Sequence, residues 1–172
     1  DLKKPVKAEL RARYAPGATP QESVASFLRT MRDLAGDPTL ELFTEGSRLM
    51  RKFYPLAPFE EWQRADSLEV SKPLEYLIDG DYAVATSRKP GMGFTPVLMH
   101  REQGLWRVDL VETWKNLFFN SEGNYYLRNS NTPYLFGLKQ FGPAGYEDIG
   151  ALPLVTGSIS GCLLYTSDAA DD

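Results

Sequence analysis

The chain has 172 residues, of which 42% are hydrophobic, and a formal net charge of −4 at pH 7. That apolar content is typical of a folded domain, and the small net charge gives no electrostatic basis for binding nucleic acid or an anionic membrane surface. The single histidine, His100, excludes a multi-histidine metal site built by this chain alone. No stretch approaches the roughly 20 consecutive apolar residues that cross a bilayer, so we expect no membrane span.

Residues 1–18 are basic and lack a sustained apolar periodicity. A proline and a glycine at positions 16 and 17 then interrupt any regular element. We interpret this segment as a linker, or as the end of a truncated upstream segment, since the chain begins with Asp1 rather than Met.

Three helices are expected next, over residues 19–35, 38–54 and 59–65. The first begins with Thr-Pro-Gln-Glu at positions 19–22, which is the pattern of a capping box with proline at the first helical position. Gly36 is expected to end that helix. Its apolar stripe, at helical spacing, consists of Val24, Phe27, Leu28, Met31 and Leu34.

From Ser67 onward the apolar period shortens toward two, which predicts an antiparallel sheet of about four strands. Asp79-Gly80 and Gln103-Gly104 have the composition of tight hairpin turns, because glycine readily adopts a positive φ. Helices followed by a meander indicate an α+β fold with the helices against one sheet face. The strands are expected to centre near Tyr76, Val84, Leu98 and Val108.

This order of elements resembles the nuclear transport factor 2-like superfamily, also called the ketosteroid-isomerase-like cone. The resemblance rests on TPQESVASFLRTMRD at 19–33, LEYLIDGDYAVATS at 74–87 and GLWRVD at 104–109, and it covers residues 19–119. It implies N-terminal helices packed in a strongly bent antiparallel sheet, with a pocket at the wide end of the cone. It also implies that the chain is either an isomerase, dehydratase or hydrolase, or a non-catalytic binding or assembly domain.

Alternation along the last strand places Trp106, Glu112 and Trp114 on the core face and Asp109 on the other face, where Asp109 would form a surface pair with Arg107. Glu112 could be a general base if the core raises its pKa, or it could reach water at the strand end. Trp106 is expected in the core near the first helix, and Trp114 is expected to anchor the C-terminal segment.

His100 shares its face with apolar residues, which is typical of a structural histidine, although its ordinary pKa suits acid–base catalysis. Tyr82 could donate a hydrogen bond to a ligand oxygen, or be an amphipathic core residue. The catalytic candidates are therefore Glu112, His100, Tyr82 and Asp109. The expected pocket residues are Tyr76, Tyr82, Trp106 and Trp114. The sequence contains no glycine-rich phosphate loop, zinc-binding helix pair or nucleophile elbow, so we expect no cofactor and no metal.

Residues 120–161 combine many aromatic residues with turn formers, which predicts an irregular extension that wraps back onto the sheet or begins a truncated second domain. Residues 162–172, CLLYTSDAADD, resemble the read-through translation of a transposase-based sequencing-library adapter. Without them the chain loses three aspartates and has a net charge of −1. It also loses its one cysteine, so disulfides, cysteine-ligated zinc and thiol catalysis are not expected.

The favoured functional interpretation is a non-catalytic accessory, ligand-holding or assembly domain of a larger bacterial protein, with a small apolar ligand as partner. One alternative is a small-molecule isomerase, dehydratase or hydrolase that uses a pocket carboxylate. Another is a scaffold that forms a homodimer through an open sheet face. An enzyme would require an acid and a hydrogen-bond donor that converge on one pocket.

Overall fold

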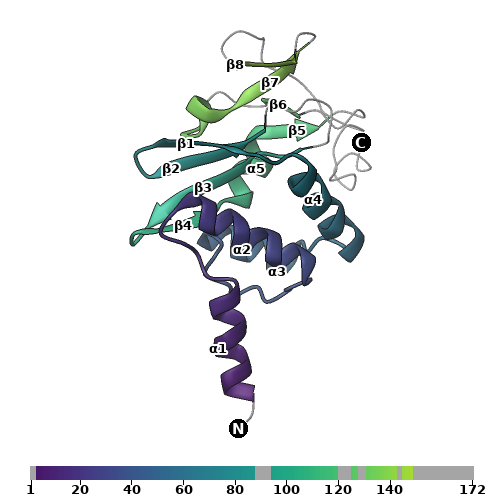
Figure 1. Ribbon diagram of the computed structural model, residues 1–172, viewed down its shortest axis with the longest axis vertical. Helices are drawn as coiled ribbons and strands as arrows, with labels where there is room; N and C mark the ends of the chain where they lie inside the picture. The colour runs from purple at the N-terminus through teal and green to yellow at the C-terminus, as the bar shows by residue number, and fades with distance from the viewer. Residues whose placement is uncertain (1–2, 88–93, 120–124, 128–130, 143–144, 149–172) are drawn as a thin grey trace.

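The computed structural model describes residues 3–87, 94–119, 125–127, 131–142 and 145–148 of the chain. These residues form an α+β fold in which helices pack on one face of a four-stranded antiparallel sheet, as the sequence predicts (Figure 1). Within the described ranges, no helix combines the length and the apolar character needed to cross a membrane. The adapter-like residues 162–172 lie outside the described part of the chain.

Within residues 1–18, which we interpreted as a linker or the end of an upstream segment, Lys3–Arg13 form helix α1. This segment is rich in the good helix formers Lys, Ala, Leu, Glu and Arg, but it lacks the apolar stripe on which the prediction depended. Figure 1 shows α1 projecting away from the rest of the molecule. Its C-terminal end is held by Asp33, whose Oδ2 accepts hydrogen bonds from Arg13 Nε at 2.7 Å and the Tyr14 hydroxyl at 2.8 Å.

Helix α2, Pro20–Arg32, begins with the predicted capping box. The Glu22 backbone N–H donates to Thr19 Oγ1 at 3.3 Å, and the Thr19 N–H donates to Glu22 Oε2 at 3.1 Å. The helix ends four residues before Gly36. Leu34, with a φ of 53°, takes the left-handed conformation that we expected of the glycine.

Helices α3, Glu45–Phe53, and α4, Pro58–Val70, differ in their bounds from the predicted 38–54 and 59–65. Asp37 Oδ1 accepts hydrogen bonds from the backbone N–H and the hydroxyl of Thr39, at 2.8 and 2.7 Å, and these local bonds compete with a helix there. The helical period continues to Val70, so the change to strands comes after Ser67. Pro73 then prevents further helix.

The sheet consists of β1, Glu75–Asp79, β2, Tyr82–Thr86, β3, Val97–Glu102, and β4, Leu105–Val108, in that spatial order. Each of the four predicted strand centres lies in the expected strand. Gly80, with φ 60°, begins the two-residue turn before β2. Gln103 and Gly104, with φ of 54° and 77°, form the turn before β4, as the turn composition predicts.

The predicted strand over residues 105–114 ends at Val108, because Leu110–Asn116 form helix α5. The Asp109 carboxylate caps this helix by accepting a hydrogen bond from the Glu112 N–H at 3.1 Å. Trp106 and Trp114 therefore lie on a strand and on a helix, rather than on one strand face. Alternation of apolar and polar residues indicated a strand here, but a local cap ends it.

Both faces of the central strands are buried. On one face, β2 to β4 contribute Ala83, Ala85, Val97, Met99, Trp106 and Val108 to a core that we call the helix-side core, which also contains Val24, Met31, Leu42 and Phe43. On the opposite face, Val84 and Leu98 pack with Leu117, Leu127, Tyr134 and Leu138 in a second cluster, here called the outer core.

The outer core is completed by chain segments that follow α5. They are β5, Leu117–Phe119, β6, Tyr125–Leu127, and the 3-10 turn η1, Leu135–Gly137, followed by a hairpin of β7, Lys139–Gly142, and β8, Gly145–Asp148. Figure 1 shows these segments on the opposite side of the sheet from α2 and α3. The packing of Leu127, Tyr134 and Leu138 favours a C-terminal extension that wraps back onto the sheet.

The outer edge of β4 is hydrogen-bonded to two segments from the N-terminal half of the chain. The Trp106 N–H donates to the Gly17 carbonyl at 2.9 Å, and the Val108 N–H donates to the Leu42 carbonyl at 2.7 Å. The Thr44 N–H in turn donates to the Val108 carbonyl at 3.0 Å. The loops before α2 and α3 therefore continue the hydrogen-bonding pattern of the sheet beyond its last strand.

Candidate functional site

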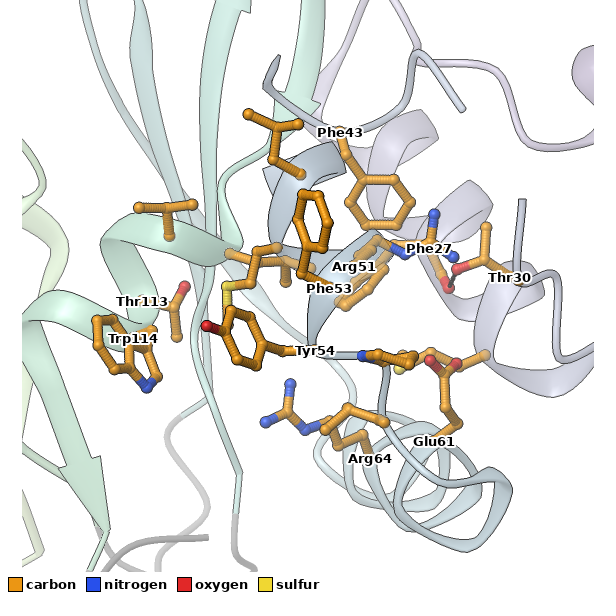
Figure 2. Close-up of a pocket in the computed structure, with 18 of the residues that line it drawn as sticks. Phe27, Thr30, Phe43, Arg51, Phe53, Tyr54, Glu61, Arg64, Thr113 and Trp114 are labelled. Carbon is orange, nitrogen blue, oxygen red and sulfur yellow. Dashed lines mark hydrogen bonds between the residues drawn. The ribbon is translucent and has the colours of Figure 1, made fainter. Parts of the chain in front are cut away.

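A pocket of about 620 Å³ lies between helices α2, α3, α4 and α5 (Figure 2). This size falls within the range typical of small-molecule sites. The pocket is bounded by α5, which begins after β4 at Asp109, and by the segment between α3 and α4, which contains Pro55 and is followed by Pro58 at the start of α4. Residues from all four helices line the pocket.

The pocket wall is mainly apolar. Phe27 from α2 and Phe43, which precedes α3, meet edge to face with ring centroids 5.9 Å apart. Aromatic pairs of this geometry add to the stabilisation from burial, so this part of the wall is rigid. The other apolar wall residues include Met31, Leu49, Met50, Leu110, Val111 and Trp114.

Arg51 is the charged residue placed among these rings. Its guanidinium lies 4.1 Å from the centroid of Phe43 and donates to the carbonyls of Ala35 at 2.6 Å and Asp37 at 2.9 Å. Burial lowers the pKa of Arg51, while Glu61 and Asp37 act to raise it. Arg51 thus holds the loop after α2 against α3, and much of its hydrogen-bonding capacity is used within the chain.

Two threonines on the wall also have partners within the protein. The Thr30 hydroxyl donates to the Phe27 carbonyl at 2.6 Å, and the Thr113 hydroxyl donates to the Asp109 carbonyl at 2.9 Å. These internal bonds leave the two threonines presenting chiefly their methyl groups as ligand-contacting surface.

Glu61 is the acidic residue of the wall. In Figure 2 its side chain rises from α4 toward the helix that carries Thr30. Burial raises the pKa of Glu61, and the positive charges of Arg51 and Arg64 act against that rise. In the part of the chain that the structure describes, its carboxylate has no hydrogen bond or ion pair at contact distance.

The rim of the pocket carries exposed aromatic side chains. Phe53 is 65% exposed, Tyr54 78% and Trp114 37%. Large apolar side chains on a rim mark an opening through which an apolar molecule could enter.

Of the four residues predicted to form a pocket, only Trp114 lines this one. Trp106 is 2% exposed and belongs to the helix-side core with Met31, which agrees with its expected core position. Tyr76 packs against the same core from β1, and burial raises its pKa. The expectation that Trp114 anchors the C-terminal segment stays a prediction.

Three of the four catalytic candidates gather on the opposite face of the sheet, around Tyr134. Tyr82 stacks on His100 with ring centroids 4.7 Å apart and meets Tyr134 edge to face at 5.3 Å. The Tyr134 hydroxyl donates to Asp109 Oδ2 at 2.8 Å. We call Tyr82, His100, Asp109 and Tyr134 the Asp109 cluster.

The structure corrects the expected exposure of Asp109. Its side chain is 9% exposed, and its two oxygens accept hydrogen bonds from Tyr134 and from the first turn of α5. Burial raises the pKa of Asp109, while these hydrogen bonds lower it. Arg107, its predicted surface partner, is itself 7% exposed, and its guanidinium donates to the Glu41 carbonyl.

Glu112 lies in the first turn of α5, where its backbone N–H donates to Asp109, and it does not line the pocket. Its Oε2 accepts a hydrogen bond from Asn116 Nδ2 at 2.6 Å, and its Oε1 lies 4.0 Å from Lys115 Nζ. The candidate acids and donors thus do not converge on the pocket. Among the described residues, no group of three or more His, Cys, Asp or Glu side chains is placed to hold a metal ion.

Three residues important to these sites were missed from the sequence. Arg51 and Glu61 lie on different helices, and their approach depends on the packing of α3 against α4. Tyr134 lies in an irregular segment with many aromatics, so nothing local distinguishes it as the partner of Asp109. The sequence did hold a signal for the start of α5, because the run Asp109-Leu110-Val111-Glu112 has the spacing of a helix cap.

Comparison with protein-family models, curated proteins and solved structures finds no match for this chain.

Proposed function

We propose that this chain is a ligand-holding domain of the nuclear transport factor 2-like type, which binds a small, largely apolar molecule without transforming it. The observation that carries the proposal is the apolar pocket of about 620 Å³ between α2, α3, α4 and α5. The element order, helices followed by a four-stranded antiparallel meander, supports the assignment to this cone-shaped superfamily.

The chemistry of the wall supports binding over catalysis. Polar groups of the wall donate hydrogen bonds to backbone carbonyls of the chain itself, as Arg51, Thr30 and Thr113 do. A site built for acid–base chemistry needs a titratable group and a donor aimed at the same reacting atom. Here the candidate acid Asp109 and the candidate donors Tyr82 and His100 lie on the far side of the sheet.

The enzyme alternative would have to use the Asp109 cluster, because three of its four candidates meet there. Tyr134 covers Asp109, and its own side chain is 0% exposed. A substrate could reach the carboxylate only after Tyr134 had moved away. The homodimer alternative depends on an open sheet face, but Val84 and Leu98, at the centre of that face, are buried by the outer core.

Binding can be tested with N-phenylnaphthylamine, a neutral apolar dye that becomes fluorescent in apolar cavities. The wild-type protein should enhance its emission and show energy transfer from tryptophan, because Trp114 lies on the pocket wall. Met50→Trp, which places a larger side chain on the wall, should weaken dye binding about tenfold or more, equivalent to about 1.4 kcal/mol.

Ile78→Trp is the matched control, since Ile78 is 54% exposed on β1 and does not line the pocket. It introduces the same side chain and should leave the dye affinity unchanged. Equal affinities of the wild type and Met50→Trp would show that the dye binds elsewhere. No enhancement by the folded wild-type protein would contradict the proposed function itself.

A further inference from the structure

We infer that Glu61 is the polar anchor of the pocket, and that the ligand is a neutral, mainly apolar molecule with one hydroxyl group that donates a hydrogen bond to the Glu61 carboxylate. This inference rests on the proposed ligand-holding function and specifies the chemistry of that site. It depends on three features: the contrast between Glu61 and the other polar wall groups, the charges around it, and the apolar surface of the cavity.

Glu61 differs in its hydrogen bonding from the threonines and arginines of the wall. Thr30, Thr113 and Arg51 are each bonded to a backbone carbonyl, and Arg64 has a contact of its own. Within the described residues, Glu61 is the carboxylate on this wall that lacks such a partner. A carboxylate can only accept hydrogen bonds, so a ligand that satisfies it must bring a donor.

The charges near Glu61 select among donors. Arg51 and Arg64 both act on Glu61 as positive charges. An ammonium group placed at Glu61 would meet one negative and two positive side chains, and a ligand carboxylate would meet Glu61 itself. A hydroxyl group avoids both repulsions and still forms a charge-assisted hydrogen bond, which is stronger than a bond between neutral groups.

The apolar part of the pocket wall determines the chemistry of the rest of the ligand. Phe27, Phe43, Met31 and Val111 surround the space beyond Glu61 with carbon atoms. A ligand with a second strongly polar group would lose the hydration of that group without replacement. One hydroxyl on an apolar body is therefore the chemistry that this wall fits.

The test compares two isomers, n-decanol and methyl nonyl ether, as competitors for bound N-phenylnaphthylamine. They have the same atoms and nearly the same apolar length, but only the alcohol can donate a hydrogen bond. The wild-type protein should bind the alcohol about tenfold more tightly than the ether, as expected of one hydrogen bond to a charged acceptor. The n-decylammonium ion should bind more weakly than the alcohol.

Glu61→Leu should abolish the preference for the alcohol while retaining the dye, and Glu61→Gln should reduce the preference, because an amide oxygen is a neutral acceptor. Glu60→Gln, at the exposed neighbouring position on α4, should leave the preference unchanged. Equal binding of the two isomers by the wild type, tighter binding of the ammonium ion, or an unchanged preference in Glu61→Leu would each overturn the inference. The comparison of the alcohol and the ether uses only the wild-type protein, so it does not depend on the folding of any variant. Binding of the dye itself tests the proposed ligand-holding function separately.

Discussion

Asp109 performs two structural tasks with one carboxylate. One oxygen caps α5, and the other accepts the hydroxyl of Tyr134, so the end of the sheet, the pocket helix and the C-terminal segment meet at this side chain. Burial raises the pKa of Asp109 above its ordinary value near 3.9. The folded protein therefore holds this proton at a pH at which the unfolded chain has already released it.

This gives a prediction about pH. From about pH 4 up to the raised pKa, the folded state binds more protons than the unfolded state, so the contribution of Asp109 to the free energy of unfolding should fall as pH rises. Asp109→Asn should remove this dependence, because asparagine also caps helices but does not titrate. Urea unfolding across this range should show the stability of the wild type declining relative to the variant. Parallel pH profiles would contradict the raised pKa.

The two tryptophans around Asp109 should differ in their effect on stability. Trp106 is 2% exposed in the helix-side core, so Trp106→Ala should cost about 3–5 kcal/mol of unfolding free energy. Trp114 is 37% exposed on the pocket wall, so Trp114→Ala should cost much less and should mainly weaken dye binding and energy transfer. Denaturation curves and dye titrations of both variants test this, and similar destabilisation by both would place Trp114 in the core.

At the scale of elements, α3 and α5 are joined by one buried hydroxyl. Ser47 on α3 is 0% exposed, and its Oγ accepts the backbone N–H groups of Leu110 at 2.8 Å and Val111 at 3.3 Å. These N–H groups belong to the first turn of α5, where a helix has no internal acceptor for them. A side chain from another helix thus supplements the cap provided by Asp109.

Ser47→Ala should therefore destabilise the protein by about 1–3 kcal/mol, the usual cost of leaving buried donors unsatisfied. The affinity for the dye should also fall, because residues of both α3 and α5 line the pocket. Gln63→Ala, at an exposed position on α4, should change stability by less than about 0.5 kcal/mol. If Ser47→Ala leaves the free energy of unfolding in urea unchanged, a water molecule must replace the Ser47 hydroxyl as acceptor.

How far the sequence predicts these elements depends on how local their causes are. The capping box at Thr19 and the turns at Gly80 and Gly104 involve only neighbouring residues, and the structure has them as expected. The α5 boundary was missed because residues 106–114 alternate as a strand would, although Asp109 has the spacing of a cap. The pocket anchor Glu61 could not be predicted, since its surroundings come from four separate helices.

At the scale of the whole molecule, the sheet is a central layer with buried side chains on both faces. Gly137 in η1 lies so close to β2 that an added Cβ would be 2.7 Å from Val84. The backbone of the C-terminal segment therefore packs directly on β2 at Gly137, and any side chain at this position would prevent that approach. Residues 19–119 and this extension are expected to unfold together.

Gly137→Ala tests that expectation, because overpacking of this kind costs about 1–3 kcal/mol. The loss should appear in the global unfolding transition followed by tryptophan fluorescence, since Trp106 lies on the other face of the sheet. At Gly36 an added Cβ would lie 4.0 Å from the Leu34 carbonyl oxygen, an ordinary contact, so Gly36→Ala should be neutral or stabilising by less than about 1 kcal/mol. If Gly137→Ala only loosened the C-terminal segment, the extension would be an independent unit.

The hydrogen bonds along the outer edge of β4 have a consequence for self-association. An exposed last strand offers unpaired N–H and C=O groups to which a strand of another molecule can add, and this is a common start of aggregation. Here the Gly17, Leu42 and Thr44 backbones occupy those groups on β4. The protection comes from residues that lie far earlier in the chain, so a partly unfolded molecule lacks it until its N-terminal loops have docked. Removing residues 1–18 would uncover the Trp106 N–H and make this edge available to a neighbouring molecule.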